Sequence, residues 1–175
     1  TRNPAMPARR PALALCLALI ACSSPKPTTT FTSANPFANP SPLQYQAPAF
    51  DKIHNEDFQP AIEEGMRVQI AEVGTIAADA APPTFDNTIV ALERSGQLLT
   101  RANNVFGALT QANTSDTLQG LQTELAPRLA AHSDAIRMNP VLFARIKTLY
   151  DARATLGLDT VQQFLVERYY KDFVR

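Results

Sequence analysis

The sequence predicts an all-α fold built of antiparallel helical hairpins. From about residue 55 onward, apolar residues recur at spacings of three, four or seven, so they fall on one face of each helix. Proline, asparagine and serine clusters divide this pattern into segments of helix length. No segment shows the strict apolar and polar alternation of a strand, so no competing fold class arises.

The first helix is predicted to begin near Asn55 to Asp57, where acidic residues suit the positive end of the helix dipole. Pro60 then falls inside the first turn, where its missing N–H is tolerated. The helix must stop by about residue 80, because two prolines follow at 82 and 83. Its predicted buried stripe is Phe58, Ile62, Met66, Ile70, Val73 and Ala77. We also expect Glu63 to pair with Arg67, four residues on.

The second helix is predicted over residues 84–112, capped by Thr84 or Asp86. Its stripe is Ile89, Leu92, Leu99, Ala102, Phe106 and Leu109. Gly96 lies on the same stripe, although a glycine inside a helix costs up to about 1 kcal/mol relative to alanine. We therefore expect a neighbouring helix to approach closely at Gly96.

The third helix is predicted to follow a turn and cap at residues 113–116. Its stripe is Leu118, Leu121, Leu125, Leu129, His132 and Ile136. Pro127 lies in its interior, so we expect a kink or a restart near Leu125. Asn139 then supplies a cap and Pro140 the first position of the next helix.

The fourth helix is predicted from Pro140 to about Leu156, ending at Gly157, and partly burying Phe143, Ile146, Leu149 and Tyr150. A fifth begins with a capping box between Thr160 and Gln163. Its stripe is Val161, Phe164, Leu165, Tyr169 and Phe173, and Glu167 is four residues before Lys171, the favourable order for an ion pair. No helix-closing signal follows, so we expect the helical domain, residues 49–175, to be truncated at its C-terminal end.

The first 21 residues are predicted to be a leader whose true start is Met6. Arg9 and Arg10 precede an apolar run at residues 12–21, which is too short to span a bilayer but suits a signal peptide. The run ends in the letters LIAC at residues 19–22, which resemble a bacterial lipobox, so Cys22 is the predicted lipidation site. The alternative is an ordinary signal peptide followed by a chance cysteine. Lipid on Cys22 would anchor the chain to a membrane in the cell envelope, facing the periplasm, and Ser23 favours the outer membrane.

Residues 22–48 are rich in proline, serine and threonine and form the predicted tether. Aromatic residues appear from Asn35 onward, so we expect this later portion to lie across the folded body and bury a ring or two. Cys16 leaves with the leader and Cys22 carries lipid, which leaves no thiol for a disulfide, a metal or a nucleophile.

The composition and motifs exclude several functions for the chain alone. Beyond the leader the charge is slightly negative, which argues against nucleic acid. Zinc hydrolysis needs two imidazoles on one helix face beside a carboxylate, as in H-E-x-x-H. The chain has only His54 and His132, far apart; we expect His54 to be solvated and His132 to be a hydrogen-bonded interior residue. There is also no G-x-S-x-G and no phosphate loop, so no catalytic or metal residue is assigned.

Several runs of residues, in one order, resemble a known family. The chain is similar to zinc peptidases of the thimet oligopeptidase family, and within it to the bacterial peptidyl-dipeptidases. The runs are NPF at 35–37, APAFDKI at 47–53, FQPA at 58–61, PTFDNTIVALE at 83–93, LAAH at 129–132, NPVLF at 139–143 and ERYYKDF at 167–173. The resemblance extends from about residue 35 to the last residue.

This resemblance implies a much longer, two-lobed helical metallopeptidase, of which these residues form part of the N-terminal helical lobe. The implied parent uses a zinc-bound water, activated by a glutamate, to hydrolyse short peptides and release C-terminal dipeptides. Its H-E-x-x-H helix belongs to a missing C-terminal catalytic region beyond Arg175, so the segment present shapes the substrate channel and is expected to be inactive alone.

The alternative is a complete small helical envelope lipoprotein that acts as a binding or structural module. A closed domain should bury its apolar stripes internally, whereas a fragment should leave an apolar face without a partner.

Overall fold

The predicted all-α fold is confirmed. The computed structural model describes Thr1 and residues 30–174, and every regular element in that part is helical. The leader and Cys22 lie outside the described residues, so their assignment and the domain boundaries stay predictions. The elements are two 3₁₀ turns, η1 (Gln44–Gln46) and η2 (Phe50–Lys52), a π-helical segment, η3 (Phe85–Val90), and six α-helices: α1 (Asn55–Ala78), α2 (Ala91–Arg94), α3 (Gln97–Ala112), α4 (Asp116–Arg137), α5 (Pro140–Ala152) and α6 (Thr160–Val174).

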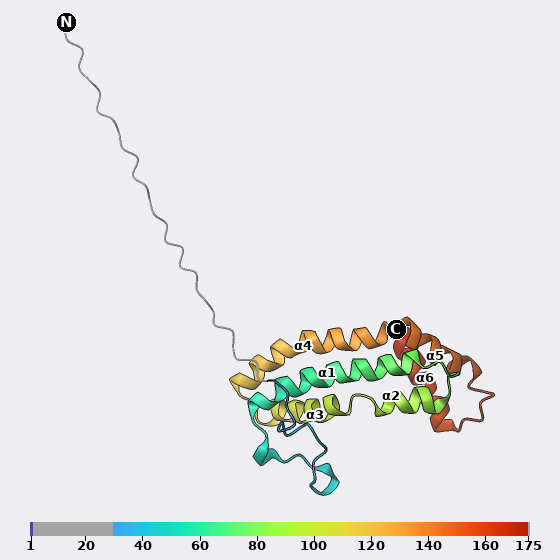
Figure 1. Ribbon diagram of the computed structural model, residues 1–175, viewed down its shortest axis with the longest axis horizontal. Helices are drawn as coiled ribbons and strands as arrows, with labels where there is room; N and C mark the ends of the chain where they lie inside the picture. The colour runs from blue at the N-terminus through green and yellow to red at the C-terminus, as the bar shows by residue number, and fades with distance from the viewer. Residues whose placement is uncertain (2–29, 175) are drawn as a thin grey trace.

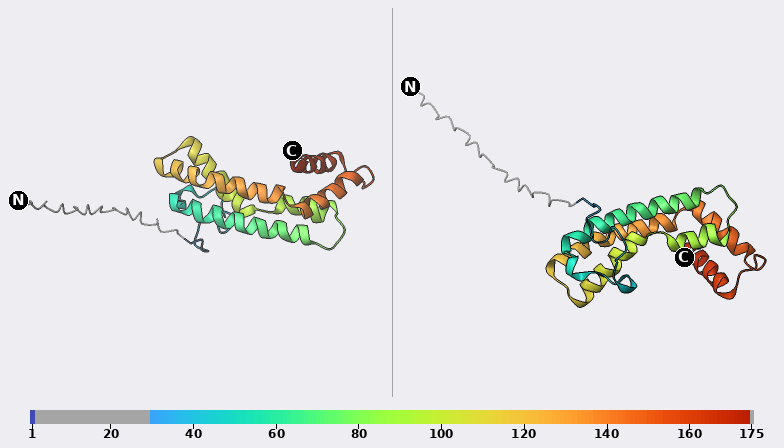
Figure 2. Two further views of the ribbon diagram at one scale, coloured as in Figure 1. Left: turned by 90° about the horizontal axis from the view of Figure 1, so that it is seen from above. Right: turned by 60° about the horizontal axis from the view of Figure 1, so that its bottom comes forward.

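The long helix α1 lies at the centre of a row of helices (Figure 1). It packs against α4 on one side and against α3 and α2 on the other, while α5 and α6 pack together at one end of the row. Figure 2 shows α6 at that end and the segment 43–52 near the opposite end. None of the helices among the described residues is long and apolar enough to cross a membrane.

Two separate hydrophobic clusters hold the helices together, and α1 is buried in both. The first joins the N-terminal segment, α1, α3 and α4, with core residues Phe37, Phe58, Ala61, Ile62, Ala102, Val105, Phe106, Leu118 and Leu125. The second joins α1, η3, α2, α5 and α6, with core residues Val73, Ala77, Ile89, Leu92, Leu142, Ile146, Leu149 and Val166. The interior is therefore divided along its length.

The predicted stripe of α1 is confirmed except at one position. Phe58 and Ile62 are buried in the first cluster and Val73 and Ala77 in the second. Ile70 was predicted to be buried but is exposed, because it falls between the two clusters.

The predicted helix starts follow the cap residues closely. Thr84 accepts a hydrogen bond from the backbone N–H of Asn87, Ser115 from Leu118, and Asn139 from two N–H groups of α5. α1 begins at Asn55 as expected. Pro60 is consequently the sixth helical residue, so the prediction that it lies in the first turn is wrong.

The prediction of one continuous helix over residues 84–112 is wrong at Gly96. Ser95 is extended and Gly96 adopts the left-handed conformation, with φ 69° and ψ 25°, so the chain makes η3 and α2, breaks, and resumes as α3. The expected close approach is confirmed, because a Cβ on Gly96 would lie 2.4 Å from the side chain of Gln69 in α1. α1 also approaches α3 closely at Gly65, where a Cβ would lie 2.7 Å from the backbone of Leu99.

The restart expected in the third helix does not occur. α4 is helical without interruption from Asp116 to Arg137 through Pro127, and leucines before and after that proline pack on the first cluster. The alternative expectation, a kink near Leu125, stays a prediction. The fourth helix is shorter than predicted and ends at Ala152, with Gly157 in a later turn at φ 66°.

The capping box of the last helix lies one residue earlier than predicted. Asp159 and Gln162 exchange side-chain and backbone hydrogen bonds of 2.8 and 3.1 Å, while Gln163 donates to the carbonyl of Leu158. With this start, α6 buries Val166 and leaves Val161 and Phe164 exposed by 74% and 64%, so the predicted stripe is wrong at those two positions.

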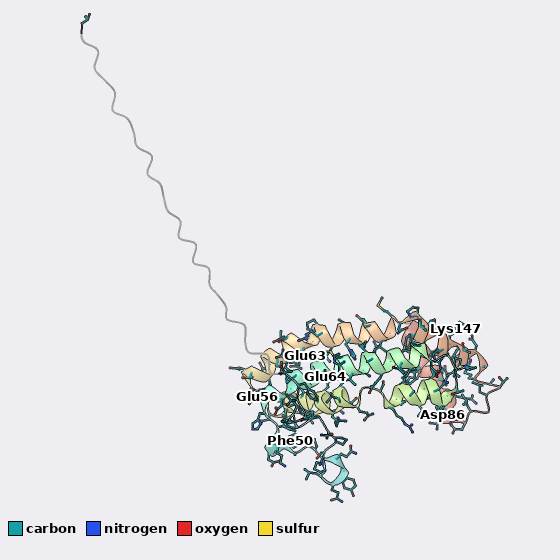
Figure 3. All side chains as sticks on the ribbon, in the orientation of Figure 1. Phe50, Glu56, Glu63, Glu64, Asp86 and Lys147 are labelled. Carbon is teal, nitrogen blue, oxygen red and sulfur yellow. The ribbon has the colours of Figure 1, made fainter. Side chains whose placement is uncertain are left out.

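One of the two predicted ion pairs is confirmed. Glu167 lies 2.5 Å from Lys171. Arg67 instead pairs with Glu64, its neighbour three residues earlier, at 2.6 Å. Glu63 turns to α4 and pairs with Arg128, and Figure 3 labels both glutamates on α1.

Candidate functional site

A groove of about 470 Å³ lies between the N-terminal segment and α3. Figure 1 shows that this segment runs below α3 before entering α1. The groove mixes apolar walls with amide and charged side chains. Its lining includes Phe37, Asn39, Leu43, Gln46, Lys52, Ile53, Arg101, Asn104 and Val105. We call it the α3 groove.

A local turn fixes the outer wall of the α3 groove. The side-chain oxygen of Asn35 accepts a hydrogen bond from the N–H of Phe37 at 2.9 Å, and its amide donates to the carbonyl of Asp57 at 3.0 Å. The turn directs the Phe37 ring into the first cluster, where its centroid lies 5.4 Å from that of Phe58. The expectation that this portion buries a ring is therefore confirmed for Phe37.

Arg101 of α3 is one of three charged residues that line the α3 groove, together with Asp51 and Lys52. Its Nη2 donates to the carbonyl of Phe37 at 3.1 Å and so ties α3 to the outer wall. Its Nε is buried and has no hydrogen-bond partner among the described residues. Burial lowers the pKa of the Arg101 guanidinium from its ordinary value. The group stays charged at neutral pH.

A polar layer lies between the two hydrophobic clusters, at the break before α3. The carboxylate of Glu72 accepts a hydrogen bond from the N–H of Gly96 at 2.7 Å. The side-chain oxygen of Gln69 lies 2.8 Å from Nε2 of His132. Burial lowers the pKa of His132. His132 is therefore hydrogen-bonded as expected, but it is only half-buried rather than interior.

The histidines do not form a metal site. His54 is exposed at the start of α1, with its Nδ1 3.5 Å from the carboxylate of Asp57, whereas His132 of α4 contacts Gln69 of α1. Within residues 30–174 no three histidine, cysteine, aspartate or glutamate side chains are grouped so that they could hold a metal ion. The side chains of this part of the chain therefore do not fit a catalytic zinc.

Sequence reasoning missed a buried arginine that fixes the linker after α1. Nη1 of Arg145 donates to the carbonyl oxygens of Asp79 and Ala81 at 2.6 and 3.1 Å, and Nη2 donates to the side chain of Asn87 at 3.0 Å. The available signal was its place on the buried stripe of α5, beside Ile146 and three residues after Leu142. A charged residue at such a position requires partners, because an unpaired buried charge is costly.

Aromatic side chains join α5 to α6. The rings of Tyr150 and Tyr170 stack with centroids 3.9 Å apart, and Phe143 stacks on Tyr170 at 5.9 Å. Tyr169 lies beside Glu93 of α2, and burial, followed by the charge of Glu93, raises its pKa. These contacts fix one side of α6, while its exposed side carries Val161 and Phe164 together with charged residues such as Arg168 and Lys171.

The sequence of this chain is similar to those of known peptidases. No family model matches the chain. Over 143 residues, or 82% of this chain, it is 45% identical to a protein named dipeptidyl carboxypeptidase from Escherichia coli strain K12. The two chains are homologous over this stretch. The homologous protein of the same name from Salmonella typhimurium is 43% identical over 142 residues.

A more distant relative, oligopeptidase A of E. coli, is 24% identical over 135 residues, or 77% of this chain. The chain spans only about a fifth of these relatives, since the match covers 21% of the length of dipeptidyl carboxypeptidase and 20% of oligopeptidase A. A stretch of 143 residues within a chain of 175 must include residues 33–143, so the α3 groove lies inside the homologous region.

Proposed function

We propose that this chain forms the N-terminal part of a peptidase that hydrolyses short peptides and releases dipeptides from their C-termini. The observation that carries the proposal is the 45% identity to dipeptidyl carboxypeptidase over 143 residues. Random similarity does not extend over four fifths of a chain at this level. The activity in that name belongs to the relative, and its transfer to the parent of this chain is the hypothesis to test.

The proposed role of this segment is to shape one wall of the substrate channel. An elongated row of helices with its interior split into two clusters supports that role, because it offers a long face to a second lobe. Val161 and Phe164 on α6 support it too, since large exposed apolar side chains commonly mark surfaces that another part covers. We propose that zinc, its ligands and the general base come from the remainder of the parent, as the family resemblance implies.

We further propose that lipid on Cys22 anchors the protein in the cell envelope, facing the periplasm and attached to the outer membrane. The apolar run at residues 12–21 and the letters LIAC at 19–22 support this location. Expression of the gene with Cys22→Ser should move the protein from the membrane fraction to the soluble periplasmic fraction. A wild-type mature N-terminus other than acylated Cys22, measured by mass spectrometry, would contradict the anchor.

The activity is tested on the complete protein encoded by the gene that contains this chain. The substrates are one N-blocked tetrapeptide with a free C-terminal carboxylate and the same peptide with a C-terminal amide. We expect release of a dipeptide from the first only, and loss of that activity with a zinc chelator. Equal cleavage of the amidated peptide would indicate endopeptidase activity instead of dipeptide release. Absence of cleavage of both peptides would refute the peptidase proposal.

A further inference from the structure

The chain packs on the helical body well before α1 begins. We call residues 31–38 the strap. Phe31 is half-buried against the first cluster, and Phe37, which is 4% exposed, forms part of the core of that cluster. Two backbone hydrogen bonds within the strap, of 3.0 and 2.9 Å, fold it into consecutive turns. The strap is therefore a packed part of the body, although its sequence is rich in polar residues.

Two polar contacts fasten the strap to helices α1 and α3. The amide of Asn35 donates to the carbonyl of Asp57, in the first turn of α1, at 3.0 Å. Arg101 of α3 donates to the carbonyl of Phe37 at 3.1 Å. Release of the strap would break both hydrogen bonds and leave a cavity beside Phe58, whose ring centroid lies 5.4 Å from that of Phe37. These contacts hold the strap at the end of the body where α1 begins.

The docked strap limits how far the body can lie from a lipid on Cys22. Phe31 follows Cys22 by nine positions, and nine residues reach at most about 30 Å even when fully extended. Without the strap contacts, the chain would first meet the first cluster at Ile53, thirty-one positions after Cys22. That length of extended chain reaches about 100 Å. The strap thus reduces the greatest possible separation about threefold.

We propose that the strap holds the body at the surface of a lipid bilayer, with the end where α1 begins facing the lipid. This inference rests on the proposed acylation of Cys22. Figure 3 labels Glu56 at that end and Asp86 at the opposite end of the row of helices. α1 lies between them, contains 24 residues and is about 36 Å long. The end that carries the strap stays within reach of the anchor, whereas the opposite end can lie further away by up to that length.

The orientation is tested by energy transfer from the body to the bilayer. The complete acylated protein is reconstituted in vesicles of phosphatidylethanolamine and phosphatidylglycerol that carry an acceptor dye on their head groups. The donor dye is attached through an azide-bearing residue that replaces either Glu56 or Asp86, both of which are exposed. Transfer from position 56 should exceed transfer from position 86. Equal transfer from the two positions would contradict the orientation and overturn the proposal.

Matched variants test the strap itself. Phe37→Ala removes a ring from the core, whereas the control Phe50→Ala removes a ring that is 54% exposed. Transfer from position 56 should fall in Phe37→Ala, because the permitted separation rises about threefold, and stay at the wild-type level in Phe50→Ala. Asn35→Ala, which removes the hydrogen bond to α1 without emptying the core, should give a smaller fall. Circular dichroism checks that each variant keeps its helices, and unchanged transfer in helical Phe37→Ala would overturn the proposal.

A lengthened tether separates failure of the strap from failure of the anchor. Glycine and serine residues are inserted after Thr29, in the number that separates Phe31 from Ile53, so that the strap itself is untouched. This insertion should lower transfer from position 56 as much as Phe37→Ala does. Wild-type transfer no higher than that of the insertion variant would overturn the role of the strap and leave acylation intact. An unacylated Cys22 in the purified protein, found by mass spectrometry, would overturn both.

Discussion

Replacement of Gly96 by alanine should lower the free energy of unfolding more than its loop position suggests. Gly96 is buried between α2 and α3 at φ 69° and ψ 25°. A residue with a Cβ in this left-handed region costs about 1–2 kcal/mol. The backbone cannot shift freely to relieve that cost, because the Gly96 N–H donates to Glu72 at 2.7 Å.

A second contribution comes from the neighbouring helix. The new Cβ would lie 2.4 Å from Cδ and Nε2 of Gln69, so that side chain must move. Its contact with His132, 2.8 Å long, is then lost, at a net cost of about 0.5–1.5 kcal/mol. The two contributions together predict a loss of about 1.5–3.5 kcal/mol for Gly96→Ala.

Urea unfolding followed by circular dichroism measures this loss, and Gly157→Ala is the matched control. Gly157 has nearly the same backbone, φ 66°, but no atom lies within 4 Å of its added Cβ. It should therefore show the backbone cost alone. In a Gln69→Ala background, Gly96→Ala should also cost less than in the wild type. Equal losses for Gly96→Ala and Gly157→Ala would refute the role of the close approach.

Three further changes test other contacts. Gly65→Ala should destabilise the chain by about 1–3 kcal/mol in urea unfolding, because its Cβ would lie 2.7 Å from the backbone of Leu99. The free energy of unfolding should fall as the pH drops below about 6.5, because burial lowers the pKa of His132 and the unfolded chain therefore binds the proton more readily. Urea unfolding midpoints measured across this pH range should show the fall, and His132→Gln should make it smaller. Arg145→Met should cost about 1–3 kcal/mol, measured by thermal unfolding, because the carbonyl of Asp79 loses its donor.

Each of these predictions has its own control. Gly74→Ala lies on the same helix as Gly65 with open space around its Cβ, so it should raise stability by up to about 1 kcal/mol. A loss at Gly74 equal to that at Gly65 would show that crowding is not the cause. A pH slope unchanged in His132→Gln would assign it to other groups. Full stability in Arg145→Met would mean that water replaces the guanidinium.

Local signals in the sequence predicted the helices and most of their starts. Thr84, Ser115 and Asn139 each satisfy N–H groups within a few residues of themselves, so their role is readable from the neighbouring sequence alone. The break at Gly96 was not readable in this way. It depends on Glu72 and Gln69, which lie more than twenty residues away and reach it only after α1 packs against α2 and α3.

The α3 groove was beyond sequence reasoning for the same physical reason. Its outer wall depends on the hydrogen bond from Asn35 to the carbonyl of Asp57 and on that from Arg101 to the carbonyl of Phe37. The left-handed backbone of Tyr45 and Gln46, with φ 57° and 56°, was not predicted either, because this conformation is normally expected at glycine or asparagine. The sequence resemblance nonetheless identified the peptidases to which the chain is homologous.

Because the interior is divided into two hydrophobic clusters, a destabilising substitution in one cluster should affect the two halves of the molecule unequally. Packing lost from the α5 and α6 end removes contacts of Val73 and Ala77 but none of the core contacts around Phe58. A destabilising substitution at that end should therefore unfold the half that contains α5 and α6 first. Protection of amide hydrogens from exchange should be lost in that half and retained around Phe58 and the α3 groove. Substitutions can therefore accumulate in either half with limited effect on its counterpart, provided that the shared helix α1 stays intact.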